Sequence, residues 1–134
     1  MRRAALMPFL ALPWLAACQT GSTAYAPVEN VRYAAIGQDP FWMLTIGDDR
    51  IVLRLAEAPG EDANEAVWPR TLPRTVDGVT TWESGEGVAV IAVESRPGPC
   101  TGARGHRYQD HVRIRLNGRE LAGCGGRLIA DHRE

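Results

Sequence analysis

Apolar and polar residues alternate along much of the chain after residue 30, in the pattern typical of short β-strands. Ile51, Leu53 and Leu55 alternate with Val52 and Arg54, which predicts a strand with one core face and one more polar face. We also expect strands at residues 31–36, 41–46 and 112–116, and a buried central strand at residues 87–94, which are apolar on both faces.

Short turn sequences separate these strands. Gly47-Asp48-Asp49 lies between two apolar runs, and Asp77-Gly78 is a strong hairpin signal. Asn117-Gly118 predicts a type I′ turn, so that residues 112–116 and 120–124 form a hairpin whose register is set by a two-residue loop.

The stretch from residue 56 to residue 73 is less regular. It is acidic and contains three prolines, so we expect mostly loop, with one helical turn at residues 63–67. Residues 96–99, Arg-Pro-Gly-Pro, break the chain before Cys100. No convincing amphipathic helix follows Cys18. The pattern therefore predicts an all-β fold of about seven or eight short antiparallel strands, closed into a small barrel or a tight sandwich.

The start of the chain differs from the rest. Arg2 and Arg3 precede an uncharged stretch at residues 4–17, which is shorter than the roughly 20 apolar residues that span a bilayer. This is the pattern of a secretory signal peptide. Residues 15–18, Leu-Ala-Ala-Cys, resemble the lipobox of bacterial lipoproteins, in which the cysteine is acylated and becomes the new amino terminus. An ordinary signal peptide with an incidental cysteine is the alternative.

The lipobox divides the chain into three parts. Residues 1–17 are the predicted signal peptide, residues 18–30 are a lipidated Cys18 and a flexible tether, and residues 31–134 are a single β domain. Two or more acyl chains anchor a protein firmly in a lipid bilayer. Gln19 rather than Asp after the cysteine favours, by the sorting rule of such lipoproteins, the outer membrane facing the periplasm. We expect a monomer there.

The cysteines predict one disulfide. The chain has three of them, and lipidation uses Cys18. Cys100 and Cys124 then remain in an oxidising compartment, where a bond between them contributes roughly 3 to 4 kcal/mol. A metal site would need further ligands nearby, and a reactive thiol would need a partner base.

Charge is distributed unevenly. All 15 basic residues are arginine, which excludes lysine nucleophiles and Schiff bases. Residues 18–95 contain 5 arginines and 12 acidic residues, whereas residues 96–134 contain 8 arginines and 4 acidic residues. One interpretation is that the two parts pair across the domain surface. The other is a basic patch that binds phosphate or carboxylate groups of an envelope polymer; nucleic acid is not expected outside the cytoplasm.

The residues of the candidate binding patch come from two groups. Phe41 and Trp42 start a strand, where an aromatic pair more often belongs to the core than to a cleft, and Trp68 and Trp82 have the same interpretation. The basic members are four arginines, of which two lie on the loop after Cys100 and two on the outward face of the following strand: Arg104, Arg107, Arg113 and Arg115.

Nothing in the sequence indicates catalysis. His106, His111 and His132 are the only histidines, and no acidic pair lies at metal-ligand spacing from them, apart from Asp110 beside His111. Ser84 and Ser95 lack a nucleophile-elbow motif. We therefore expect no enzyme activity, no metal and no cofactor.

Two stretches resemble a known family. Residues 35–42, Ala-Ile-Gly-Gln-Asp-Pro-Phe-Trp, resemble the G-N-E-P-F-W opening of a group of uncharacterised bacterial envelope lipoproteins. The second block is similar at residues 100–108 and 117–125, where Asn-Gly-Arg-Glu-Leu-Ala-Gly-Cys-Gly matches a "dGr-L-GC" hairpin end. The loop at residues 101–109 departs from the family, because it lacks the usual Asp, Met-Ser and Pro. The resemblance implies an envelope barrel without an assigned reaction.

These lipoproteins are loosely similar to small barrels of the HslJ/META type and to periplasmic lysozyme inhibitors. The leading hypothesis is therefore a non-enzymatic binding or structural module in the cell envelope, with an envelope polymer or a protein as partner. The alternative is a lysozyme-inhibitor-like protein that inserts the loop between Cys100 and Cys124, with Arg104 and Arg107, into a glycosidase cleft. Known membrane-bound inhibitors use a Ser and a Lys, and this chain has no Lys.

Overall fold

The structure is a computed structural model that describes residues 28–130. The predicted signal peptide, Cys18, most of the tether and His132 lie outside the described residues. Within residues 28–130, no helix is long and apolar enough to cross a membrane.

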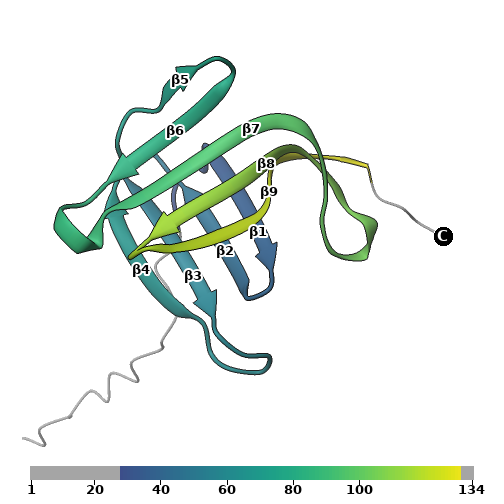
Figure 1. Ribbon diagram of the computed structural model, residues 1–134, viewed down its shortest axis with the longest axis horizontal. Coiled ribbons are helices and arrows are strands. Elements are labelled where there is room, and N and C mark those ends of the chain that lie inside the picture. Colours follow the sequence, from purple (N-terminus) through teal and green to yellow (C-terminus); the bar gives the residue numbers. More distant parts are fainter. Residues whose placement is uncertain (1–27, 131–134) are drawn as a thin grey trace, which may run out of the picture.

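The domain is one antiparallel sheet of nine strands that curls into a half-barrel (Figure 1). This confirms the all-β prediction, although the sheet has more strands than the seven or eight expected. The strand order is β4-β3-β2-β1-β9-β8-β7-β6-β5. The strands are β1 (Tyr33–Gln38), β2 (Phe41–Ile46), β3 (Arg50–Ala56), β4 (Asn64–Pro69), β5 (Arg74–Val76), β6 (Val79–Ser84), β7 (Ile91–Thr101), β8 (Arg107–Leu116) and β9 (Arg119–Ala130), and two 3-10 turns are η1 (Gly87–Ala89) and η2 (Ala103–Gly105).

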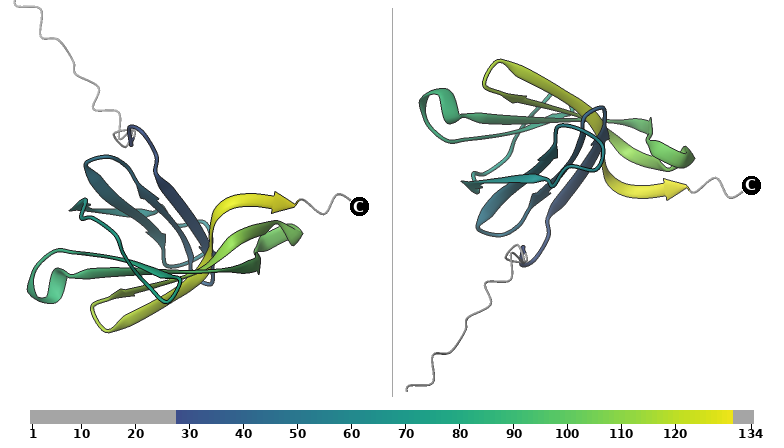
Figure 2. Two further views of the ribbon diagram at one scale, coloured as in Figure 1. Left: turned by 90° about the horizontal axis from the view of Figure 1, so that it is seen from above. Right: turned by 90° about the horizontal axis from the view of Figure 1, so that it is seen from below.

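The sheet folds over on itself at the junction of β1 and β9. Figure 2 shows two layers, one formed by β1 to β4 and the other by the later strands, which meet along this junction. Ala35 pairs with Gly125 and Ile36 with Cys124, so strands from opposite ends of the domain are neighbours. All other strand pairs are adjacent in sequence.

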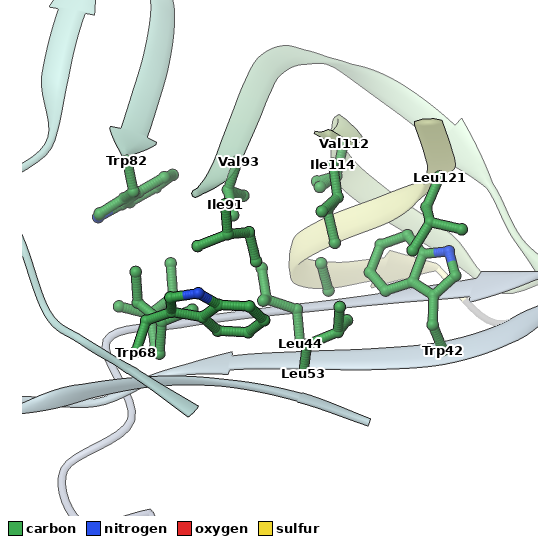
Figure 3. Packing of buried hydrophobic residues seen from close by; sticks show 13 residues of the cluster. Trp42, Leu44, Leu53, Trp68, Trp82, Ile91, Val93, Val112, Ile114 and Leu121 are labelled. Carbon is green, nitrogen blue, oxygen red and sulfur yellow. The ribbon is translucent and has the colours of Figure 1, made fainter. Parts of the chain in front are cut away.

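The core fills the space between the two layers. In Figure 3, Trp42, Leu44, Leu53 and Trp68 point from one layer toward residues of the other. Burial of each large aliphatic side chain contributes about 1.5 to 3 kcal/mol. The facing layer contributes a second set of buried side chains: Trp82, Ile91, Val93, Val112, Ile114 and Leu121.

The hairpin predictions are confirmed. Asp77 and Gly78 join β5 to β6, with φ of 51° and 78°. Asn117 and Gly118 join β8 to β9, with φ of 52° and 71°. Positive φ at both central residues is the requirement of a type I′ turn, which Asn, Asp and Gly meet most easily.

The prediction of loop and a helical turn at residues 63–67 is wrong, because this segment forms most of β4. Val67 pairs with Val52, and Glu65 pairs with Arg54, whose Nε lies 3.0 Å from the Glu65 carboxylate. Trp68 on the opposite face enters the core. Pairing with β3 and burial of one large ring therefore outweigh the weak local preference of this polar sequence.

Two further boundaries differ from expectation. Residues 87–89 form η1 rather than strand, and Val88 is 86% exposed. The Pro-Gly-Pro sequence does not end a strand, because β7 continues to Thr101. The register shifts between Pro97 and Cys100, so the extra residues form a bulge in β7.

Side chains connect the edge strand β4 and the residues after it to the end of β6 and to η1. The Ser84 hydroxyl donates to the Pro69 carbonyl oxygen at 2.6 Å, and the Trp68 indole N–H donates to the Ala89 carbonyl oxygen at 2.7 Å. The Thr71 hydroxyl also donates to the Glu83 carbonyl oxygen, at 2.8 Å. These bonds connect the β4 side of the sheet to β6 and η1.

Candidate functional site

Cys100 and Cys124 form a disulfide, as predicted, with Cα atoms 5.5 Å apart. The bond links β7 to β9 across β8, which lies between them in the sheet. Cys100 pairs with Tyr108 and Cys124 with His111 on that central strand. The cystine therefore fixes the end of β7 where the chain leaves the regular sheet.

The two stretches that carry the family resemblance meet beside this cystine. A Cβ atom on Gly37 would collide with the Trp42 indole. A Cβ on Gly123 would lie 2.7 Å from Trp42 Cζ2 and would also collide with the Ile36 carbonyl oxygen. Because Gly37 and Gly123 have no side chains, β1, β9 and the Trp42 ring pack in direct contact. This close packing makes this part of the surface rigid.

A groove of about 590 Å³ opens above this packed region, and we call it the cystine groove. Gln38 and Asp39 form one wall, and residues 101–103 form the other. The floor and one end are made of small groups and one imidazole: Gly37, Cys100, Ala122, Gly123, Cys124 and His111. Its size lies in the range of small-ligand sites.

A second hollow lies on the other side of Gln38 and Asp39. Residues 56–61 line it together with Phe41 and Arg119. Arg119 donates two hydrogen bonds to the Glu57 carboxylate, at 2.6 and 3.0 Å, and these bonds lower the pKa of Glu57. The Gln38–Asp39 turn is therefore an exposed ridge between two hollows.

The structure separates Phe41 from Trp42. They are adjacent in a strand and so point to opposite faces. Phe41 is 41% exposed and lines the second hollow, whereas Trp42 is 1% exposed and belongs to the core. Trp42 has no surface available for a ligand.

Arg113 and Arg115 lie on the outward face of β8, as predicted, within a ladder of ion pairs. Arg113 pairs with Glu120 through its Nε. The Glu94 carboxylate of β7 accepts a hydrogen bond from Nε of Arg96 at 2.9 Å. Its other oxygen lies 3.6 Å from Nη2 of Arg115. Some of these pairs join the acidic and basic parts of the chain, so the interpretation of surface pairing applies to this face.

Arg104 and Arg107 lie elsewhere, Arg104 in η2 and Arg107 at the start of β8. Arg104 has φ of 57° in η2 and, like Arg107, is exposed. Neither forms an ion pair with another residue in the described part of the chain. Arg113 lies six positions after Arg107 along β8, which is roughly 20 Å. The six residues predicted as one patch therefore occupy separate places.

A polar network connects the two layers. The Tyr33 hydroxyl lies 2.8 Å from Ser95 Oγ and donates to Asp110 Oδ2 at 3.0 Å. Burial raises the pKa of Tyr33, the hydrogen bond with Ser95 opposes the rise, and the negative charge of Asp110 adds to it. Tyr33 thus stays protonated and is no base for Ser95, so the network holds β1, β7 and β8 together.

Sequence reasoning missed this network and the cystine groove. Gln38 and Asp39 lie on one segment and His111 on another, and only Gln38 and Asp39 fall within a motif that was singled out. Among residues 28–130, no group of three or more His, Cys, Asp or Glu side chains is placed to hold a metal ion.

No model of a known protein family matches the chain, and no curated protein or solved structure matches it. The resemblance to envelope lipoproteins is therefore carried by its two motifs alone.

Proposed function

We propose that this protein is a lipoprotein of the bacterial outer membrane whose β domain is a non-enzymatic binding module for an envelope polymer. The observation that carries the proposal is the cystine groove. Its floor is held by a disulfide and by close glycine packing, and its wall presents Gln38 and Asp39 to solvent. Such a preformed surface binds a ligand without the entropy cost of ordering the binding site.

The electrostatics of the groove support binding rather than catalysis. Catalytic groups usually have shifted pKa values inside a cleft. In the described chain, the partly buried group with a raised pKa is Tyr33, which is engaged in the interlayer network. The other shifted groups are surface members of ion pairs outside the groove, such as Glu57 and Asp48.

The attachment of the tether also supports this function. Asn30 and Arg32 both donate to Asp48 in the β2–β3 turn, at 2.8 and 2.6 Å. The Gln38–Asp39 ridge lies at the opposite end of β1, which has six residues and is about 20 Å long. In a domain anchored through Cys18, the cystine groove would therefore lie at the end of β1 remote from the attachment of the tether.

The anchor is tested with the full-length chain carrying Cys18→Ser. Cells grown with labelled palmitate should label the wild-type protein and leave the variant unlabelled. Label on the variant would disprove lipidation at Cys18.

The binding module is tested by blocking the groove. Ala122 is exposed and lines the groove, so Ala122→Trp should fill it without disturbing the core. Ala34→Trp is the matched control, because Ala34 is an exposed strand residue outside both hollows. Full-length protein in mild detergent is mixed with insoluble peptidoglycan and centrifuged. We expect wild type and the control to pellet and roughly tenfold weaker binding of Ala122→Trp. No pelleting, or equal behaviour of the two variants, would refute the proposal.

Inhibition of a lysozyme is a second candidate function, favoured by one observation. Arg104 and Arg107 are exposed and free of ion pairs within residues 28–130. They lie in η2 and at the start of β8, within the segment that the Cys100–Cys124 disulfide closes. A lysozyme cleft holds two carboxyl groups with which an inserted arginine can pair. Full-length protein should then inhibit lysozyme, and a double Arg104→Ala and Arg107→Ala variant should not. Arg74→Ala, at another exposed arginine, is the control. Absence of inhibition at micromolar concentration would remove this candidate.

A further inference from the structure

The cystine groove continues into a smaller hollow on the outward face of β7, β8 and β9. His111, Ala122 and Gly123 line both of them. The smaller hollow, of about 150 Å³, is bounded further by Arg96 and Arg113. We call the combined depression the outer trough. It runs from the Gln38–Asp39 ridge, across the cystine, to the arginines of the ion-pair ladder.

The two ends of the outer trough carry opposite charges. Asp39 is exposed at one end and forms no ion pair with another described residue. Arg96 and Arg113 line the other end. Together with the neighbouring Arg115 they pair with two glutamates, Glu94 and Glu120, so the ladder at this end has one positive charge left over. The ridge is therefore negative and the ladder end is positive.

The arginines at the positive end retain free donors. Glu94 accepts from Nε of Arg96 at 2.9 Å, and Glu120 pairs with Nε of Arg113. The terminal Nη groups of Arg96 and Arg113 form no hydrogen bond with any other residue of the described chain. The glutamates thus hold both guanidinium groups in place while leaving the donors that match a carboxylate.

The strand register gives the length of the trough. Arg96, His111, Cys124 and Ile36 are successive cross-strand partners, so three strand spacings of about 4.8 Å separate β7 from β1. Asp39 lies just beyond the end of β1. The strands between Arg96 and β1 therefore span roughly 15 Å, which is the length of four or five extended residues.

We propose that the outer trough binds a short peptide of four or five residues, with its free amino group at Asp39 and its free carboxylate at Arg96 and Arg113. This inference rests on the proposed binding function and adds the ligand class. Ala122 is exposed and lines both hollows, and its small side chain lets a peptide backbone lie close to the sheet there. Capture of a terminal carboxylate is a recurring mode of peptide recognition.

Charge complementarity favours a peptide over a phosphate polymer. Both a carboxylate and a phosphate fit beside arginine forks. A polymer with negative charge along its whole length would, however, place one of its anionic groups against Asp39. Only a ligand with a cationic group at one end and an anionic group at the other matches both ends of the trough.

The test uses full-length protein in mild detergent and pentaalanine, its C-terminal amide and its N-acetyl form, with affinity measured by calorimetry. We expect amidation and acetylation each to weaken binding by roughly tenfold. In Arg96→Gln the effect of amidation should shrink, and in Asp39→Asn the effect of acetylation should shrink. Arg74→Gln, distant from the trough in β5, should respond to both changes as wild type does.

Equal affinity for the three peptides, or inorganic phosphate binding at the arginines without any binding of pentaalanine, would overturn this inference. The peptidoglycan experiment separates it from the proposed function. If wild-type protein pellets in an Ala122-dependent manner but ignores pentaalanine, the ligand class is wrong and the binding module stands. If neither probe binds, both proposals fail.

Discussion

Two glycines set the distance between the layers at the β1–β9 junction. Gly37 makes room for the Trp42 indole, and Gly123 makes room for both that ring and the backbone of β1. A methyl group at either position would have to displace backbone atoms or a buried ring, neither of which moves easily in a packed core. The same two glycines lie under the cystine groove, so packing and groove shape depend on the same residues.

Gly123→Ala should therefore destabilise the domain. Its Cβ would lie 2.7 Å from Trp42 Cζ2 and 2.9 Å from Gly37 Cα, and overpacking of this kind costs about 1 to 3 kcal/mol. Gly102→Ala is the control, because its nearest contact is Tyr108 Cε2 at 3.3 Å. The measurement is urea denaturation followed by tryptophan fluorescence. An equal, small loss of unfolding free energy in both variants would show that the junction can accommodate an additional methyl group.

Tyr33 should make stability depend on pH in the alkaline range. Its pKa is raised in the folded state by burial, whereas an unfolded tyrosine titrates near about 10. Below pH about 10 the stabilisation is complete, and above it the unfolded chain loses a proton that the native state keeps, so stability falls. The slope is at most about 1.4 kcal/mol per pH unit, and smaller because the ring is only partly buried.

Tyr33→Phe supplies the control for this pH dependence. At neutral pH it should lose about 1 kcal/mol, because Ser95 and Asp110 lose a hydrogen-bond partner. Between pH 9 and about 11 its stability should fall less steeply than that of wild type. Parallel curves from urea titrations at these pH values would contradict a raised pKa of Tyr33.

For single residues, the sequence predicted which side chains are buried but not which distant residues they bind. Alternation along a strand, with the preference of aromatic pairs for cores, favoured a buried Trp42, and the ring is buried. The bonds of Tyr33 reach Ser95 and Asp110, which are 62 and 77 residues away. No local pattern encodes such contacts, because they depend on which strands become neighbours.

Among the elements, β7 and β9 depend most on a covalent bond. The cystine joins residues 24 apart in sequence and spans β8. It limits the conformations of the unfolded chain, which stabilises the fold by roughly 3 kcal/mol. Reductant should therefore lower the melting temperature by on the order of 10 °C while leaving a folded domain, because the core between the layers does not include the cystine.

A double Cys100→Ala and Cys124→Ala variant checks the cause of that change. It should melt near the reduced wild-type protein and show no response to reductant. An unchanged melting temperature on reduction, or two reactive thiols titrated in oxidised protein, would show that the bond does not stabilise the domain.

The elements that sequence predicted best are those with strong turn chemistry. Asp77-Gly78 and Asn117-Gly118 need positive φ at both positions, and few other pairs adopt it easily. The segment at residues 64–69 was missed because it lacks a regular alternation and ends in proline. It becomes a strand only because β3 offers it backbone partners and the core accepts Trp68.

In the whole molecule, sequence indicated an all-β domain but did not decide between a barrel and a sandwich. Seven of the eight contacts in the strand order join consecutive strands, and hairpin signals account for several of them. The remaining contact, β1 with β9, folds the sheet into two layers and creates the cystine groove. It brings together segments from the two ends of the domain, which no local turn sequence specifies.

The half-barrel should be held shut by the side chains that connect β4 to the end of β6 and to η1, and Ser84 is the best place to test this. Its buried hydroxyl donates to the Pro69 carbonyl oxygen at 2.6 Å. Ser84→Ala leaves that oxygen without this partner, so the free energy of unfolding should fall by about 1 to 2 kcal/mol. The loss should appear first as faster amide hydrogen exchange in β4, because that edge strand pairs through its backbone only with β3.

Thr75→Ala is the matched control for the edge contact. It removes an exposed hydroxyl pair, Thr75 with Thr80 at 2.9 Å, from the β5–β6 hairpin and away from β4. Its stability should change by less than about 0.5 kcal/mol and its β4 amides should exchange as in wild type. If the β4 amides exchange at the same rate in Ser84→Ala and Thr75→Ala, the tryptophans and the rest of the core alone hold the two layers together. If only Ser84→Ala exchanges faster there, the edge bonds close the half-barrel.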